Sequence, residues 1–394
     1  MTRTKSSVSP ARRSSDGKDA SPSLVLGIMS GTSVDAVDYA LCAIGPDRVD
    51  LRKHWQARYT LPLQRRLHAA AAGTATSWEV GALHHELGRF FVRGLGKELE
   101  GVALSAVGLH GQTIFHQPDP AAPATLQIGE PAWLAEALRV PVVSNFRAGD
   151  LAAGGQGAPL ATLFHQVVFG RRGEFVCVNN LGGISNVTAL DWREGEEPRV
   201  LAFDTGPANV LMDIAARHYS KGRRSFDLNG AWAARGTVNG ELVERWLTHK
   251  FFHQPPPKST GREVFGEKFW ERALAEATRA HLTPEDLLAT LSEFTAASLA
   301  LNYSLHLGGV PSRVVACGGG AANPDLMRRI RSRLQAWQPT VEVVTSEELG
   351  WGKQQIEAAA FALLAYRRLR HLPGNLPATT GATRPVVLGQ VTVP

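Results

Sequence analysis

Residues 24–44 read LVLGIMSGTSVDAVDYALCAI, and residues 175–190 read FVCVNNLGGISNVTAL. In each stretch an apolar run meets a turn of Gly, Ser, Thr or Asn, and a second apolar run follows at once. This pattern predicts two β-hairpins with small-residue tips. Small residues let backbone N–H groups approach phosphate oxygens closely, so two facing tips can hold a triphosphate from both sides. Glycine-rich hairpins without a ligand are also common, so the turn chemistry leaves both interpretations open.

Helical patterns alternate with the strand-like runs along the rest of the chain. They start near Glu79, Pro131, Pro284 and Gln354. A further run, SRVVACGGGAANPDLMRRI at residues 312–330, predicts a strand, a glycine turn and a helix with proline at its first position. Strands interleaved with helices in this way predict an α/β protein with helix-covered sheets.

Length and composition bound the class of protein. A chain of 394 residues predicts two or three domains of roughly 150 residues each. With 44% hydrophobic and 20% charged residues the chain can bury a core, which excludes wholesale disorder. No apolar window approaches a membrane span, the first twenty residues hold no apolar signal region, and the three cysteines (Cys42, Cys177 and Cys317) fit free thiols in a reducing compartment. These features predict a soluble cytoplasmic protein.

The net charge of +6 is unevenly distributed. Five basic and two acidic residues in the first nineteen leave +3 there, half of the total. The remaining +3 over some 375 residues is too dilute for the concentrated basic face of a nucleic-acid-binding protein. Residues 1–22 are rich in Ser, Arg, Lys and Asp, and we expect a disordered basic tail there.

The tip of the first hairpin is a candidate phosphate site. Gly31, Thr32 and Ser33 offer backbone and hydroxyl donors, and Asp35 can hold a hydrated magnesium ion, as phosphoryl-transfer sites do. The segment lacks the Gly-Lys-Ser/Thr ending of a Walker A loop. The alternative is a turn in which Ser33 and Asp35 only cap the backbone.

Asp204 is the candidate general base. It lies in FDTGPANVLMD, residues 203–213, after a strand-like run and before a Thr-Gly-Pro turn, where a carboxylate can point into a cleft. The alternative is an Asx-turn, in which the aspartate binds its own backbone.

Polar residues in FRAGDLAAGGQGAPL, residues 146–160, suit a loop that binds a hydroxyl-rich ligand through Arg147 and Asp150. The alternative is an interdomain linker. Nearby, LHGQTIFHQP contributes Gln112 and two histidines that are six residues apart, a spacing that does not indicate a zinc site. The three glycines that start at Gly318 can lie against an adenine or ribose ring, or can serve close packing of a helix on a strand.

Taken in order from MSGTSVDAVD to GNLPATTGA, these strings resemble the anhydro-N-acetylmuramic acid kinases of the actin-like ATPase and sugar-kinase superfamily, over essentially the whole chain from Leu24. The resemblance implies an α/β fold with two actin-like, ribonuclease H-like domains that flank a nucleotide and sugar cleft. We expect residues 23–147 plus 373–394 to form the N-terminal domain and residues 148–372 the C-terminal domain. A homodimer is usual in the family, and no membrane or nucleic-acid partner is implied.

The resemblance also implies the chemistry. Asp204 would activate a water that opens 1,6-anhydro-N-acetylmuramic acid at its anomeric carbon while O6 takes the γ-phosphoryl group of ATP. The products would be N-acetylmuramic acid 6-phosphate and ADP, a step of peptidoglycan recycling, with Mg²⁺ held by Asp35 directly or through water. The implied nucleotide-binding positions are Gly31, Thr32, Ser33, Val34, Asp35, Ala36, Val37, Asp38, Gly182, Gly183, Gly318, Gly319 and Gly320. The implied sugar-binding positions are Gln112, Arg147, Asp150 and Glu357.

Three departures from the family pattern keep alternatives open. Ala36 stands where glycine is usual, so the first tip would turn differently if that position needs a positive φ. Asn145 and Asn229 stand where aspartates are usual. One alternative is a kinase for another anhydro sugar such as levoglucosan, and another is a nucleotide-binding sensor without turnover.

Overall fold

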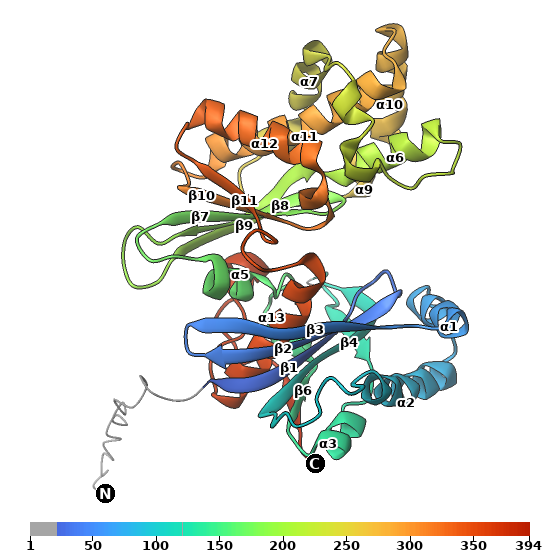
Figure 1. Ribbon diagram of the computed structural model, residues 1–394, viewed down its shortest axis with the longest axis vertical. Helices are drawn as coiled ribbons and strands as arrows, with labels where there is room; N and C mark the ends of the chain where they lie inside the picture. Colours follow the sequence, from blue (N-terminus) through green and yellow to red (C-terminus); the bar gives the residue numbers. More distant parts are fainter. Residues whose placement is uncertain (1–21, 120) are drawn as a thin grey trace, which may run out of the picture.

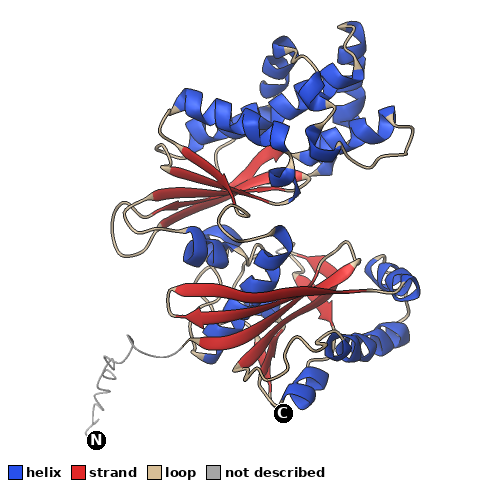
Figure 2. Ribbon diagram, viewed as in Figure 1, coloured by secondary structure: helices blue, strands red, loops and turns tan. Residues whose placement is uncertain are grey.

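The computed structural model describes residues 22–119 and 121–394, so the predicted basic tail lies outside the described residues apart from Pro22. The protein consists of two α/β lobes, one above the other in Figure 1. Helices and sheets alternate from top to bottom, and each sheet has helices on both faces (Figure 2). Within the described residues, no helix has both the length and the apolar character needed to cross a membrane.

The lower lobe contains a seven-stranded sheet. Its strands are β1 (Ser23–Ser30), β2 (Ala36–Gly45), β3 (Arg48–Arg58), β4 (Ala106–Gln117), β5 (Ala124–Ile128), β6 (Val142–Ser144) and β12 (Gln390–Thr392). The helices of this part of the molecule are α1 (Leu61–Ala71), α2 (Ser77–Arg93), α3 (Ala132–Leu138), α4 (Phe146–Ala152), α13 (Lys353–Leu369) and α14 (Pro377–Thr380).

The upper lobe contains a five-stranded sheet beneath a thick helical layer. Its strands are β7 (Phe175–Leu181), β8 (Ile184–Asp191), β9 (Arg199–Pro207), β10 (Arg313–Cys317) and β11 (Glu342–Thr345). Its helices are α5 (Thr162–Phe169), α6 (Asn209–Tyr219), η1 (Leu228–Gly230), η2 (Ala233–Arg235), α7 (Gly240–Leu247), α8 (Lys250–His253), α9 (Arg262–Phe265), α10 (Glu267–Arg279), α11 (Pro284–His306), η3 (Gly319–Ala322) and α12 (Pro324–Trp337).

The two sheets share one topology. The lower sheet has the order β12-β6-β4-β1-β2-β3 and the upper sheet the order β11-β10-β7-β8-β9. In each, the first three strands along the chain form an antiparallel meander, and the next two main strands join parallel to the first. The predicted α/β fold with two ribonuclease H-like domains is confirmed by this repeated order.

The long helix α13 lies in the layer between the two sheets. Its side chains share one apolar core with β1 and β2 below and with β7 and β10 above. Gly27 and Gly108 let it approach the lower sheet, because a Cβ on either glycine would overlap a carbonyl oxygen of α13. We predicted that residues 148–372 form the second domain; α13 belongs to that range but packs directly on β1, β2 and β4. The domain boundaries therefore stay a prediction, with α13 shared between the lobes.

The helix starts follow the local signals in the sequence. A capping box at Thr76 precedes α2, and another at Thr283 precedes α11, whose first residue is Pro284. Asn323 caps α12, as the Asn-Pro pair predicts. The segment predicted as a polar loop from Phe146 instead begins as the short helix α4. It connects the lower sheet to α5 and β7, which agrees with the linker alternative.

Candidate active site

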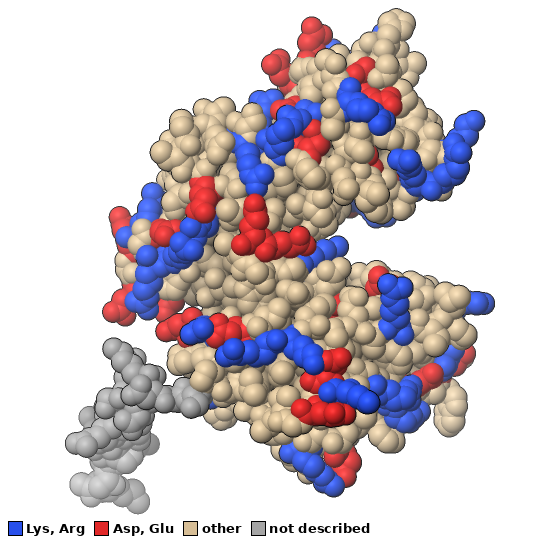
Figure 3. Space-filling model, viewed as in Figure 1, with Lys and Arg blue, Asp and Glu red and all other residues tan. Residues whose placement is uncertain are grey.

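A cavity of about 570 Å³ in the upper lobe brings the predicted glycine groups together. Separately, a hollow opens between the two lobes on the right of Figure 3, and Figure 1 places α9 at its upper edge. The cavity is lined by Gly182, Gly183, Asn209, Met212, Asp213, Phe226, Asp227, Leu228, Asn229, Gly318, Gly319, Ala322, Asn323, Glu347, Lys353 and Gln354. The second hairpin tip and the turn after β10 thus form two walls of one site.

The second tip, Gly182 and Gly183, is held in place by the start of α6. The backbone N–H of Asn209 donates to the Gly182 carbonyl at 3.0 Å, and its side-chain Nδ2 donates to the same oxygen at 2.7 Å and to Leu181 O at 3.0 Å. In a trans peptide the N–H points opposite to the preceding carbonyl, so the N–H of Gly183 points away from α6. Asn209 was missed by sequence reasoning, although an asparagine just before an apolar helical pattern is a recognisable signal.

Gly318 lets the turn after β10 pack against this tip. Its φ is +84°, and a Cβ there would lie 2.9 Å from Leu181 O and would overlap Asn180 Oδ1. These contacts agree with the close-packing interpretation, and Gly318 and Gly319 also line the cavity, so their role at a nucleotide stays a prediction. A Cβ on Gly319 would lie 3.6 Å from the Lys353 ammonium, which places a cation on the cavity wall. Lys353 was not singled out in the sequence.

The first tip exposes its polar side chains. Ser33 Oγ donates to Asp35 Oδ1 at 2.8 Å, and the N–H of Ala36 donates to the same oxygen at 2.9 Å. The backbone-capping alternative is thus observed, and the second carboxylate oxygen of Asp35 accepts no hydrogen bond from the residues that the structure describes. Val34 is the left-handed residue of the turn, with φ of +55°, whereas Ala36 is the first residue of β2. The concern that alanine at position 36 occupies a positive-φ site is therefore wrong.

Gln112, predicted at the sugar, supports this first tip from the neighbouring strand. It is 1% exposed. Its Oε1 accepts from Ser30 Oγ at 2.5 Å, and its Nε2 donates to the carbonyls of Gly31 and Thr113, each at 3.2 Å. Because both ends of the amide are engaged, the observed contacts are those of a group that positions the hairpin; its sugar-binding role stays a prediction.

Asp204 lies on β9 at a β-bulge. Asn186 pairs with Asp204 and Ser185 with Gly206, so one extra residue separates the two pairs and turns the strand. The Asp204 Oδ2 atom accepts the N–H of Thr260 at 2.8 Å. The hydrogen-bond partner comes from the loop before α9 and not from the Thr-Gly-Pro segment, which argues against the Asx-turn. The predicted turn after Asp204 is also absent, because β9 continues to Pro207.

The environment of Asp204 suits a proton acceptor. Burial raises the pKa of its carboxyl to about 6, the nearby Glu263 carboxylate adds to the rise, and the Thr260 N–H opposes it. A carboxyl with this pKa is mostly ionised at neutral pH. Its pKa is close to the working pH, which is where a general base is most effective. In the same loop, the buried hydroxyl oxygen of Thr260 has no hydrogen-bond partner among the described residues.

Arg147 and Asp150 lie in one helix, α4, but in different surroundings. Arg147 donates through Nε and Nη2 to His110 Nε2, at 3.1 and 2.9 Å. Burial and the Arg147 charge lower the pKa of His110 to about 3, so the imidazole is neutral and can accept. Asp150 is fully buried and accepts from the N–H of Gly157, Asn375 Nδ2 and Thr380 Oγ1 at 2.6–2.8 Å. The structure therefore does not bring Asp150 to an exposed surface.

Glu357 lies on α13, within the electrostatic reach of Asp38, Lys353 and Arg147. Part of the surface of Glu357 is exposed to solvent, but protein atoms surround its carboxylate on most sides. Burial raises its pKa, the Asp38 charge adds to the rise, and the two cations oppose it. Asp38 itself accepts from His54 and Gln56 of β3. Of the predicted sugar residues, Glu357 and Arg147 thus lie near one another, while Gln112 and Asp150 are enclosed by protein partners.

Lys258, in the loop before α9, is turned inward. Its ammonium donates to the carbonyls of Phe251 and Phe252 at 3.1 and 3.0 Å. Desolvation lowers its pKa to about 8. The two carbonyls occupy it, so the structure does not place it at a phosphate.

No group of three or more His, Cys, Asp or Glu side chains that could hold a metal occurs in the part of the chain that the structure describes. Magnesium rarely needs such a cage, because it usually keeps several waters and binds one or two carboxylates plus substrate phosphates. Asp35, exposed and with one uncommitted carboxylate oxygen, fits that donor set.

Comparison with known proteins identifies close relatives. A family model described as anhydro-N-acetylmuramic acid kinase matches residues 23–394. An anhydro-N-acetylmuramic acid kinase of Acaryochloris marina is 41% identical over 378 residues, which cover 93% of this chain and 99% of that protein. The Synechococcus elongatus protein of the same name is 42% identical over 378 residues, covering 93% and 98%.

Solved structures offer only distant similarity. The activator of 2-hydroxyisocaproyl-CoA dehydratase from Clostridium difficile with bound ADPNP is 13% identical with a TM-score of 0.43, covering 88% of this chain and 96% of that chain. A ROK family glucokinase from Streptomyces griseus in complex with glucose and AMPPNP is 16% identical with a TM-score of 0.36, covering 87% and 99%. At these scores the similarity assigns no function.

Proposed function

The chain belongs to the anhydro-N-acetylmuramic acid kinase family, and we propose that it converts 1,6-anhydro-N-acetylmuramic acid and ATP into N-acetylmuramic acid 6-phosphate and ADP, a step of peptidoglycan recycling. The observation that carries the proposal is Asp204, a carboxylate on a strand bulge with a pKa of about 6 and one oxygen held by Thr260. A kinase for an ordinary sugar hydroxyl also benefits from such a base, so family membership selects the anhydro substrate.

In the proposed reaction the carboxylate of Asp204 takes a proton from a water molecule. The water oxygen forms a bond to the anomeric carbon, and the bond between that carbon and O6 breaks. O6 then bonds to the γ-phosphorus of ATP, and the bond from that phosphorus to the β,γ-bridging oxygen breaks to release ADP. Phosphoryl transfer mainly needs positioning and charge neutralisation.

We assign the nucleotide to the cavity of the upper lobe. The second hairpin tip and Gly318 offer close backbone approach there, and Lys353 supplies a cation. Ser33 and Asp35 of the first tip belong to the opposite lobe and would complete the phosphate site when the lobes close. Magnesium, when bound, supplies positive charge to the phosphates, and Asp35 is the residue that would hold it, directly or through water.

The test is a coupled assay with ATP, magnesium and the anhydro sugar, with the sugar product identified by mass. The wild type is expected to yield a product heavier than the anhydro sugar by one phosphoryl group (HPO3) and one water. Asp204→Asn should lower kcat by about 10²–10⁴-fold, the usual contribution of a general base, and leave ATP affinity unchanged. A wild type that binds ATP but gives no such product, or an Asn variant of unchanged rate, would contradict the assignment.

Two further expectations belong to this proposal. The absence of a membrane-crossing helix in the described residues and the buried state of all three cysteines are compatible with a cytoplasmic protein. We also propose a homodimer, which light scattering coupled to size exclusion would test directly.

A further inference from the structure

Two walls of the upper-lobe cavity are joined by a buried ion network. One wall is residues 226–229, the first half of a segment (residues 226–233) that we call the aromatic loop, and the other is the start of α12 at Asn323. The aromatic loop presents two large apolar side chains to the cavity: Phe226 is 51% exposed and Leu228 is 59% exposed. Exposed apolar side chains on a cavity wall are suited to the face of a planar ring.

The aromatic loop is folded by Asp227. One carboxylate oxygen accepts the N–H of Trp232 at 3.0 Å, and the other accepts the N–H of Ala233 at 3.0 Å. The loop also touches the other wall, because a Cβ on Gly230 would overlap Asn323 Oδ1. The carbonyl of Ala233 is left facing α12.

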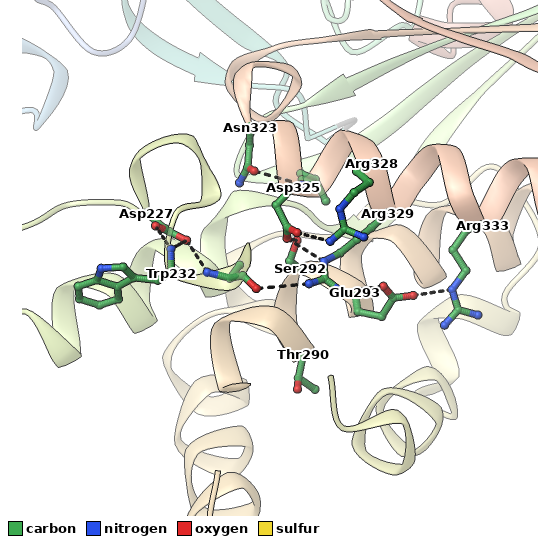
Figure 4. Close-up of polar contacts among 12 residues, drawn as sticks. Asp227, Trp232, Thr290, Ser292, Glu293, Asn323, Asp325, Arg328, Arg329 and Arg333 are labelled. Carbon is green, nitrogen blue, oxygen red and sulfur yellow. Dashed lines mark hydrogen bonds and ion pairs between the residues drawn. The ribbon is translucent and has the colours of Figure 1, made fainter. Parts of the chain in front are cut away.

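Arg329 of α12 binds that carbonyl. It is 6% exposed, and its Nη2 donates to Ala233 O at 3.4 Å while its Nε donates to Asp325 Oδ2 at 2.7 Å. Its Nη1 donates to Glu293 of α11 at 3.2 Å. Figure 4 shows Arg329 between these groups, with Asp227 and Trp232 on the loop side. One planar guanidinium therefore binds three elements in three fixed directions, which an ammonium cannot reproduce.

The hydrogen bonds around Asp325 keep its carboxyl ionised. Burial by itself would raise the pKa of its carboxyl, but hydrogen bonds from Arg329 and Arg328, with Ser292, outweigh burial and lower it. The pair stays ionised at neutral pH, so Arg329 remains anchored when it binds the loop. A buried ion pair is weak evidence for a purely stabilising role, because apolar residues of similar size often stabilise as well or better.

We propose that Arg329 is a positioning residue for the nucleotide: it holds the aromatic loop against α12 so that Phe226 and Leu228 form the wall that receives the purine ring. This inference rests on the proposed function, since it requires the cavity to bind ATP. The predicted consequence is selective: loosening the loop weakens ligands that carry a base and spares the contacts of the phosphate chain at the second hairpin tip.

The test compares Arg329→Lys with Arg333→Gln. Arg333 is a matched control because its Nε binds Glu293 at 2.6 Å in the same network but none of its hydrogen bonds reaches the aromatic loop. Affinity for ATP and for inorganic tripolyphosphate is measured by titration calorimetry, beside the KM for ATP, the KM for the sugar and kcat. Arg329→Lys is expected to weaken ATP binding and raise its KM by roughly tenfold, the size of one lost hydrogen bond to a charged group, with tripolyphosphate affinity, sugar KM and kcat within twofold of wild type. Arg333→Gln should change none of these.

Equal weakening of ATP and tripolyphosphate, or unchanged ATP binding, would overturn the inference and indicate a structural role only. If Arg329→Lys does not fold, Asp227→Asn tests the same loop from its other side, with the same selective loss expected and the same contrary outcomes. A wild type that binds neither ligand contradicts the proposed function itself, whereas a wild type that binds ATP with an unselective variant contradicts only the role of Arg329.

Discussion

The two hairpin tips occupy the same place in two sheets of the same strand order, yet they differ in what they present. The first tip, residues 31–35, exposes the side chains of Ser33 and Asp35 and is supported through Gln112 on β4. The second tip is two glycines, held by Asn209 at the start of α6, and presents backbone. The two tips therefore share a position in the fold but differ in the chemical groups that they present.

The ends of the third strands differ in the same way. In the upper sheet β9 carries Asp204, whose carboxylate has a raised pKa and one tethered oxygen. In the lower sheet β3 leads to Tyr59, whose hydroxyl is buried against Ser30 at 3.0 Å. The upper lobe thus offers the candidate base and the backbone donors, and the lower lobe offers polar side chains on a rigid support. Each prediction below alters one side of this comparison.

Lowering the pH is expected to have the largest effect on activity, because it neutralises the carboxylate of Asp204, the group that distinguishes the end of β9 from the end of β3. Burial raises the pKa of the Asp204 carboxyl to about 6, so the ionised form that acts as the base is lost as the pH falls through that value. We expect kcat/KM to fall about tenfold for each pH unit below 6. The measurement is the pH profile of the coupled assay between pH 4.5 and 8.

Glu263→Gln sharpens this test. The Glu263 charge helps to raise the pKa of Asp204, so its removal should move the acid limb to lower pH. Asp213, which lines the upper-lobe cavity and whose carboxyl pKa burial raises to about 6, is the control: Asp213→Asn should leave the limb where it is. An acid limb that shifts in Asp213→Asn but not in Glu263→Gln would show that the titrating group is not Asp204.

Asn209→Ala should have the next largest effect, because it releases the second tip. The variant loses the two side-chain hydrogen bonds, to Leu181 O and Gly182 O, and keeps the backbone bond to Gly182 O; we expect the KM for ATP to rise by roughly tenfold with the sugar KM unchanged. Asn239→Ala removes a helix cap elsewhere in the upper lobe and should cost stability without changing either KM. Steady-state kinetics with each substrate varied would decide; parallel changes in both variants would contradict a role for Asn209 at the tip.

Gln112→Ala should act mainly on stability, because the first tip rests on a buried amide. The substitution removes the acceptor of the buried Ser30 hydroxyl and one donor to the Gly31 carbonyl, which keeps the N–H of Val34, and such a loss costs about 1–3 kcal/mol. Urea unfolding measures the loss. Gln127→Ala is the control on the neighbouring strand β5, where the amide binds Thr113 and Thr125 and is only part-buried. Equal losses of unfolding free energy in the two variants would show that Gln112 stabilises the first tip no more than Gln127 stabilises its own surroundings.

Ala36→Gly should have the smallest effect. Since the left-handed residue is Val34 and position 36 is already in β2, glycine gains no needed freedom and should cost about 0.5–1 kcal/mol as a strand residue. ATP affinity should stay within twofold of wild type. A clearly tighter affinity in the glycine variant would restore the view that alanine distorts the tip.

Local patterns predicted much of the fold. The hairpin around the first tip, the strand-turn-helix at Gly318 and the start of α11 at Pro284 all depend on residues close together in the chain. The two actin-like, ribonuclease H-like domains followed from the family resemblance and are confirmed by the repeated strand order. Asp204 could be singled out because a carboxylate beside a Gly-Pro pair at the end of an apolar run is a local signal.

Roles that depend on distant partners could not be read in this way. Asp150 and Gln112 look like surface ligands in the sequence, yet Asp150 is enclosed by Asn375 and Thr380, more than 200 residues later, and Gln112 by the first hairpin. Arg329 reads as one of several arginines on an amphipathic helix until its contact with Ala233 is seen.

The sequence by itself determined the secondary structure around both tips, the family and the candidate base, because turn residues, caps and apolar runs act over a few neighbours. Only the tertiary structure decided which polar side chains remain available to a ligand and which are spent on the protein. The reason is that a buried donor or acceptor must find a partner wherever the fold brings one, and that partner is set by packing rather than by distance along the chain.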